Sequence, residues 1–195
     1  MKKIIILVII LQAILVVACI HKEQPTSAKP KGYFRIETPK PEYQKWDSLL
    51  PFSFEYSKYA QFSFEEKEPK IYWMDLQYPQ YNVSLKMSIF PLKDNLRKLI
   101  VNEEKMLMFH VESRKADDIL YSDISDTKEK VYGQMYELVG KGAATPLKFW
   151  ITDSTRYFVS ASLYFNFPPN NDSLQPVINY LKTDVLHLIE TWKWK

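Results

Sequence analysis

The single cysteine of the chain, Cys19, lies where a thiol could act as a nucleophile at a membrane surface. It directly follows Ala18, a small residue that ends a segment, residues 4–18, in which every residue except Gln12 is apolar. Residues 1–3 form a short basic start before that segment. A basic start, an apolar segment and a small residue are the parts of a secretory signal peptide. We therefore expect the thiol at the end of such a signal.

The last four residues of this segment, Val16-Val17-Ala18-Cys19, resemble a bacterial lipobox: two aliphatic residues, a small residue and a cysteine. In such signals the thiol receives diacylglycerol, the chain is cleaved before the cysteine, and the new amine is acylated, for example with palmitate. The pattern predicts that residues 1–18 are a lipoprotein signal peptide and that Cys19 is the lipid attachment site. Stable anchoring needs more than one acyl chain, and this chemistry would supply three.

Two other interpretations of this segment stay open. The apolar run from Ile4 to Ile20 approaches the length of a membrane-spanning helix, so an uncleaved anchor is an alternative. Cys19 could also be an ordinary apolar residue that ends the run.

Removal of the signal peptide leaves enough residues for one domain with a core. Because two lysines leave with the signal, 26 basic residues fall to 24, against 23 acidic residues. This balance gives no electrostatic case for nucleic-acid binding. With Cys19 acylated, no thiol remains for a disulfide, a metal site or thiol catalysis. We predict a lipidated N-terminus and flexible tether over residues 19–32, and a single α+β domain over residues 33–195.

Alternating apolar and polar side chains predict a series of short strands. The expected strands are Phe52–Tyr56, Phe62–Phe64, Ile71–Leu76, Asn82–Phe90, Val131–Gly140, Leu147–Thr152 and Tyr157–Phe167. The turn at Asp153–Arg156 predicts a hairpin between the last two. Such tight links cannot make parallel crossovers, so the sheet should be largely antiparallel.

Two helices are expected from apolar residues at helical spacing. The first runs from Asp94 as N-cap to about Glu112. The second carries an unbroken apolar stripe from Leu174 to Trp192, with Asp172 and Gln175 as a capping box and Pro176 in the first turn. The expected order is several strands, a helix, three strands and a C-terminal helix. That order predicts an α+β fold with a largely antiparallel β-sheet packed by two main α-helices.

Two polar residues, Glu103 and His110, interrupt the stripe of the first helix. They lie two turns apart, too far for direct contact, so we expect solvent or a partner elsewhere in the fold for each. A ligand-binding or catalytic role is the alternative. On the second helix His187 lies opposite the stripe, one turn from Glu190, and we expect a solvated surface pair.

No catalytic motif is evident in the sequence. The four glycines cannot assemble a phosphate-binding loop or a dinucleotide fingerprint, and there is no G-x-S-x-G or H-E-x-x-H motif. We therefore expect a non-enzymatic protein without cofactor or metal. A hydrolase whose carboxylate pair forms across the fold stays an alternative.

Aromatic residues make up 15% of the chain. Most should lie in the core, but Trp194 lies beyond the apolar stripe. Because tryptophan often anchors interfaces, Trp194 is a candidate contact for a protein partner.

Several segments together resemble the gliding motility lipoprotein GldD family of the Bacteroidota. They are KPKGYFRI at 29–36, VYG at 131–133, LYFN at 163–166, NDSL at 171–174, PVI at 176–178 and HLIET at 187–191. The resemblance extends from the lipobox to Trp194. The order of elements is also similar to that of PsbP/Mog1-like domains.

This resemblance implies an envelope lipoprotein needed for gliding and for the linked type IX secretion machinery. The family has no assigned catalytic residue, so only Cys19 carries over, as the lipidated position. The expected partners are the membrane, through the lipid anchor, and other envelope proteins of gliding and secretion. Ile20 stands where an aspartate retains some lipoproteins at the inner membrane, and no acidic surface-export tag follows. We therefore expect the periplasmic face of the outer membrane. A periplasmic carrier of a small apolar ligand is the alternative, and a hydrolase a further one.

Overall fold

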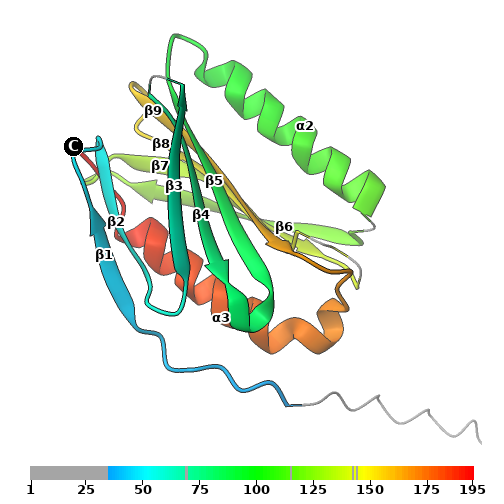
Figure 1. Cartoon of the computed structure of the whole chain (residues 1–195). Coiled ribbons are helices and arrows are strands. Elements are labelled where there is room, and N and C mark those ends of the chain that lie inside the picture. The colour runs from blue at the N-terminus through cyan, green and yellow to red at the C-terminus, as the bar shows by residue number, and fades with distance from the viewer. Residues whose placement is uncertain (1–34, 69, 115, 142, 144) are drawn as a thin grey trace, which may run out of the picture. The chain divides into compact units, whose positions relative to one another are not determined.

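The structure of the chain is a computed structural model that describes residues 35–195 except 69, 115, 142 and 144, and leaves out the side chains of 110, 113 and 114. These described residues form two antiparallel sheets and two α-helices (Figure 1). No helix in this part of the chain is both long and apolar enough to cross a membrane. The predicted tether and Cys19 lie outside the described residues.

The larger sheet, called the main sheet below, has seven strands in the described part, each antiparallel to its neighbours. In spatial order they are β3 (Gln61–Glu68), β4 (Ile71–Tyr78), β5 (Val83–Pro91), β9 (Tyr157–Phe165), β8 (Leu147–Thr152), β7 (Val131–Val139) and β6 (Asp118–Asp126). A short 3₁₀ helix, η1 (Pro79–Tyr81), links β4 to β5. The predicted α+β fold with a largely antiparallel sheet is confirmed.

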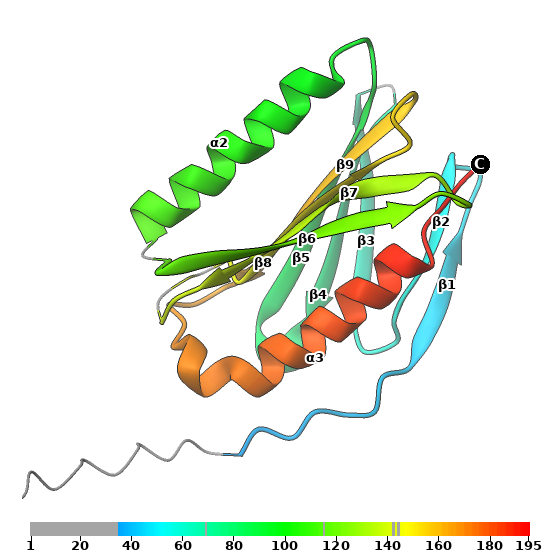
Figure 2. The ribbon, with the colours of Figure 1, turned by 180° about the vertical axis from the view of Figure 1, so that it is seen from behind.

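The smaller sheet, the small sheet, joins distant parts of the chain. It contains β1 (Tyr43–Asp47), β2 (Phe52–Ser57) and β10 (Lys193–Trp194), with β2 in the centre. The two helices are α2 (Leu96–Arg114) and α3 (Asn171–Glu190). They lie on opposite faces of the main sheet (Figures 1 and 2).

The main core lies between the α3 face of the main sheet and α3 itself. Alternate residues of β5 and β9 face α3, and the apolar stripe of α3 packs on them as the sequence predicted. The small sheet extends this core, because Trp192 is fully buried and stacks on Phe52 and Phe54, with ring centroids 5.2 and 5.0 Å away. Many of the aromatic residues therefore lie where the small sheet meets α3.

A second core lies under α2, over β7, β8 and β9. Leu107 of α2 packs there with Tyr136, Trp150 and Phe158. The indole of Trp150 stacks on Phe158 and donates its N–H to the hydroxyl of Tyr136 at 3.2 Å. On the same face Phe90 of β5 packs beneath α2, Trp73 of β4 is exposed, and the outward side chains from Ser84 to Ser88 of β5 are polar.

Several strand predictions were incomplete. Four strands, not three, separate the helices, because β6 was not predicted, and β1 and β10 were also missed. Strands β1 and β6 are exposed along most of their length, so no apolar alternation marks them. Strand β10 has only two residues and depends on its pairing with β2.

The predicted helix caps were wrong. Asp94 has a left-handed φ of 53°, and α2 begins two residues later, at Leu96. The Asn95 carbonyl, just before the helix, accepts the N–H of Leu99. Helix α3 begins at Asn171, and Pro176 lies in its second turn rather than its first. Gln175 does not close a capping box, because its side-chain amide donates to Asn179 instead.

Gly133 of β7 is required by a close approach of strand β8. A Cβ atom added at Gly133 would lie 1.9 Å from the backbone oxygen of Trp150 and 3.0 Å from the Cα of Ile151. Both neighbours are backbone atoms in a central strand, so they cannot rotate away.

We expect Gly133→Ala to lower the free energy of unfolding by about 3 kcal/mol, because overpacking a buried strand forces a backbone shift. Urea denaturation followed by circular dichroism measures this change. Gly140→Ala is not a suitable control, since Gly140 has a φ of 153°. Ser122→Ala on exposed β6 is the matched control and should change stability by less than about 0.5 kcal/mol. A wild-type midpoint for Gly133→Ala would contradict the close approach of the two strands.

Candidate functional site

Two of the predicted site residues cannot be placed by side chain. Cys19 lies outside the described residues, and lipid attachment there stays a prediction. His110 lies in α2, but its side chain is also outside the described part. The structure does describe Glu103 and Trp194.

Glu103 forms a buried ion pair with Lys148. Its carboxylate Oε2 lies 2.6 Å from the ammonium Nζ, and the two side chains are only 12% and 5% exposed. The ammonium also donates to the hydroxyl of Ser162 at 3.2 Å. Glu103 lies on the stripe of α2 that faces the main sheet. Lys148 of β8 lies on the face of the sheet that α2 covers. The expectation that Glu103 finds a partner in the fold is confirmed.

This ion pair lies at the edge of a groove between α2 and the main sheet. A pocket of about 480 Å³ is lined by Glu103 and Met106 on the helix side and by Lys86, Ser88 and Ser160 on the sheet. An adjoining pocket of about 530 Å³ shares Lys86 and Ser88 and extends to the exposed indole of Trp73.

The strand register explains the polar floor of this groove. Two rows of partners cross the sheet side by side: Trp73, Ser88 and Ser160 in one row, and Asp75, Lys86, Ser162 and Lys148 in the other. Hydroxyl, ammonium and carboxylate groups thus line the floor of the groove. Met106 and Phe165 of the first pocket and Phe64, Trp73 and Met74 of the second add apolar surface, so the groove offers contacts to polar and apolar groups alike.

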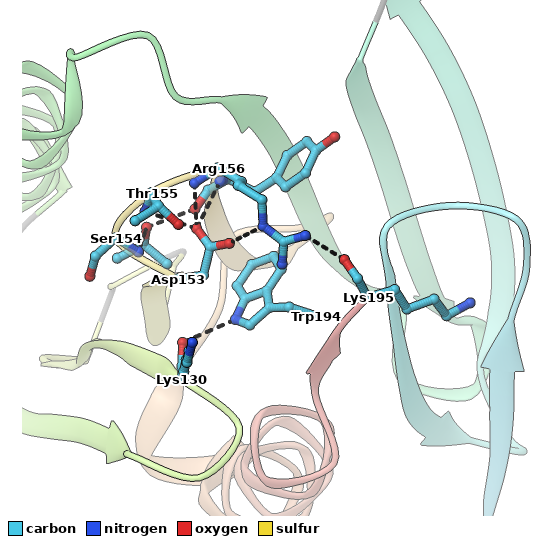
Figure 3. Close-up of polar contacts among 9 residues, drawn as sticks. Lys130, Asp153, Ser154, Thr155, Arg156, Trp194 and Lys195 are labelled. Carbon is cyan, nitrogen blue, oxygen red and sulfur yellow. Dashed lines mark hydrogen bonds and ion pairs between the residues drawn. The ribbon is translucent and has the colours of Figure 1, made fainter.

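Trp194 is packed into the domain and hydrogen-bonded there. Its indole N–H donates to the Lys130 carbonyl at 3.2 Å (Figure 3), and its ring stacks on Tyr157. Arg156 donates from its guanidinium to the Lys195 carbonyl, which holds the end of β10 against the β8–β9 turn. The indole is half-buried, and a contact with a partner through Trp194 stays a prediction.

Asp153 organises the turn that holds β10. Its Oδ1 accepts the backbone N–H groups of Thr155, Arg156 and Tyr157 at 2.7–3.0 Å, and its Oδ2 accepts the guanidinium Nε of Arg156 at 2.8 Å. Burial acts to raise the pKa of Asp153, but these hydrogen bonds outweigh it, so the pKa lies below its ordinary value.

A partly buried polar cluster between α3 and the small sheet was not predicted. His187 pairs with Glu55 of β2 at 2.8 Å and stacks on Tyr43 of β1 with ring centroids 3.6 Å apart, so the expected surface pair with Glu190 is wrong. Asp184, one turn earlier, is almost fully buried. Burial raises its pKa, whereas the hydroxyls of Ser57, Tyr43 and Tyr78 act in the opposite direction.

The Asp184 carboxylate also contributes to raising the pKa of nearby tyrosines. Burial raises the pKa of Tyr180 to about 12, although the Ser57 hydroxyl acts against this shift, and the negative charge of Asp184 adds to it. The cluster fastens β1 and β2 to α3. Its signal in the sequence was Asp184 itself, which stands beside Leu181, Val185 and Leu188 on the edge of the apolar stripe.

The described residues contain no group of three or more histidine, cysteine, aspartate and glutamate side chains that could hold a metal ion.

Comparison with known protein families places the chain among lipoproteins of gliding motility. A family model described as gliding motility lipoprotein GldD matches residues 23–194. No curated protein matches the chain.

We expect Glu103→Ala to lower the free energy of unfolding by about 3 kcal/mol, because it leaves the Lys148 ammonium buried without its counter-charge. The double variant Glu103→Leu with Lys148→Met should recover most of this loss, since it removes both charges. Glu104→Ala, at the exposed neighbouring position, should change stability by less than about 0.5 kcal/mol. Urea denaturation of the three variants provides the test. A double variant less stable than Glu103→Ala would show that the ion pair is not the cause.

We expect the stabilisation by Asp153 to depend on pH in the acid range. The folded-state pKa is depressed, so the stabilisation is fully present above the unfolded pKa of about 3.9 and is lost as the pH falls through the folded pKa. Wild type should exceed Asp153→Asn in stability by about 2 kcal/mol at pH 7, and this difference should shrink steadily as the pH falls below about 3.9. Denaturation at a series of pH values measures it. Asp117→Asn, at an exposed carboxylate, is the control and should show no such difference.

Proposed function

Because the chain belongs to the gliding motility lipoprotein GldD family, we propose that it acts as a lipid-anchored, non-enzymatic component of the gliding apparatus and its type IX secretion machinery. Its role is to bind another envelope protein at the membrane. The observation that carries this proposal is the lipobox before Cys19, followed by a polar tether and a folded domain.

Anchoring to the membrane would by itself promote binding between this protein and its partner. Two proteins confined to one membrane surface meet at a high effective concentration, so modest contacts give a stable complex. The tether between Cys19 and the first strand, β1, supplies reach. The contribution of the domain is then a surface rather than a reaction.

Polar groups of the groove are engaged with one another. The Ser162 hydroxyl accepts a hydrogen bond from Lys148, whose ammonium is also paired with Glu103. A carrier of a small apolar ligand stays the alternative, because apolar side chains such as Met106 and Trp73 line part of the two pockets. The lipobox and the tether favour protein binding at the membrane.

The proposed location is the periplasmic face of the outer membrane. Ile20 follows the acylated cysteine, where an aspartate would favour retention at the inner membrane in some bacteria. Partner proteins would then be those that assemble the gliding and secretion machinery in the envelope.

We expect Cys19→Ala to leave a folded domain that no longer sediments with membranes, with the membrane-bound fraction reduced about tenfold or more. Expressed in a strain that lacks the gene, this variant should fail to restore gliding and secretion. Ser27→Ala in the tether is the control, and it should behave as wild type. Fractionation, immunoblotting for protein amount and colony spreading are the measurements. Full rescue by the soluble variant at wild-type abundance would refute the proposal.

A further inference from the structure

The two edges of the main sheet differ in how they are protected against strand pairing. An open edge presents unpaired backbone N–H and C=O groups, and natural proteins block such edges with charges or bulges. Strand β3 has both devices. It carries Glu65, Glu66, Lys67 and Glu68, and its register with β4 shifts between Glu66 and Glu68.

Strand β6, at the opposite edge, lacks the register shift, and its charged side chains are all aspartates. It pairs with β7 in unbroken register over nine residues and contains no lysine, arginine or proline. Within the described part of the chain, β6 pairs with β7 alone. Two large apolar side chains, Leu120 and Tyr121, are exposed there by 50% and 69%.

The backbone groups that face outward from β6 follow from the register. Leu138 of β7 donates its N–H to Pro146 on the β8 side, so its neighbours Glu137 and Val139 face β6. N–H groups alternate sides along a strand. Leu120, the register partner of Glu137, therefore bonds to β7. Its neighbour Tyr121 turns its N–H and C=O away from the sheet.

Asp123 and Ser125 continue the outward set, at alternate positions after Tyr121. The N–H of Ile119 meets the carboxylate of the preceding Asp118 at 2.8 Å rather than a strand, as expected for an outward-facing group. An extended segment laid along this edge would find a regular row of donors and acceptors.

The charge of this edge indicates which segment fits. Residues 117–126 contain four aspartates and no basic residue. Among the described residues none of these four carboxylates has an ion-pair partner. Antiparallel pairing of two copies of β6 would bring aspartates together, which is unfavourable. A basic segment would be attracted instead.

We propose that β6 is the docking site for a basic, extended segment of a partner protein, which adds as an eighth strand to the main sheet. This inference rests on the proposed protein-binding function and names the surface and the chemistry of the partner. Backbone hydrogen bonds provide the affinity in strand addition, and side chains provide specificity. Here Leu120 and Tyr121 supply apolar contacts, and the aspartates supply the charge preference.

The test uses the full-length lipidated protein in detergent micelles and an acetylated nine-residue peptide of alternating lysine and valine as the probe. Hydrogen exchange is followed at single-residue resolution. We expect the peptide to slow exchange at the amides of Tyr121, Asp123 and Ser125, which are open in the free protein. The amides of Leu120 and Ser122 should be slow already, because they bond to β7. Binding should weaken as salt is raised.

Two variants examine the backbone and the charge separately. Asp123→Pro removes an outward N–H, which an edge strand tolerates, and should weaken peptide binding about tenfold by the loss of backbone bonds. The double variant Asp118→Lys with Asp123→Lys keeps the backbone groups and reverses the charge, so it should also weaken binding. Glu65→Gln on β3 removes one charge at the other edge and should leave binding unchanged. Circular dichroism confirms that each variant is folded.

Three results would overturn the inference. The first is that the peptide does not slow exchange in β6, and the second is that it slows exchange at all amides of β6 without alternation. The third is that exchange in β6 slows with protein concentration in the absence of peptide, which would indicate a second copy of the chain on β6. The proposed function is tested separately by Cys19→Ala. If that variant abolishes gliding while the peptide leaves exchange at β6 unchanged, only the assignment of β6 fails.

Discussion

The width of the main sheet is the constraint on which the rest of the structure depends. Strands in a sheet lie about 4.8 Å apart, so the seven strands described here span about 29 Å. A helix with its side chains is only about 10–12 Å wide. One helix therefore cannot cover a face of this sheet, and the chain must deal with the uncovered part of each face in some other way.

The two faces solve this problem differently. On the α3 face the small sheet adds a second covering element, and aromatic residues fill the corner between them, with Trp192 against Phe52 and Phe54. On the α2 face nothing in the described part of the chain covers most of β4 and β5, so polar side chains occupy five of their eight outward positions: Asp75, Gln77, Ser84, Lys86 and Ser88. The Glu103–Lys148 ion pair lies at the boundary between the covered and the uncovered part, where burial is nearly complete and polar neighbours begin.

Features marked by a periodic pattern within one segment could be predicted from the sequence. Features that depend on contacts between distant segments could not. The alternation from Val83 to Ile89 and the stripe from Leu174 to Trp192 were predicted because strand and helix periods are visible within a single segment. Strand β6 was missed because a strand exposed on both faces needs no apolar period. The partners of Glu103 and His187 could not be predicted, since Lys148 and Glu55 come from strands distant in the sequence. Asp184 could have been noticed, because a lone carboxylate beside an apolar stripe must be satisfied by the fold.

The pairing of β10 with β2 has a consequence for the order of events during biosynthesis. Lys193 and Trp194 are the register partners of Ser53 and Phe52, about 140 residues earlier in the chain. A ribosome makes β2 long before β10, so the small sheet cannot close and Trp192 cannot enter its aromatic corner until these later residues have been made. Contacts between such distant segments also form slowly. The corner between the small sheet and α3 thus forms only after the segments that precede β10 are already available to pair.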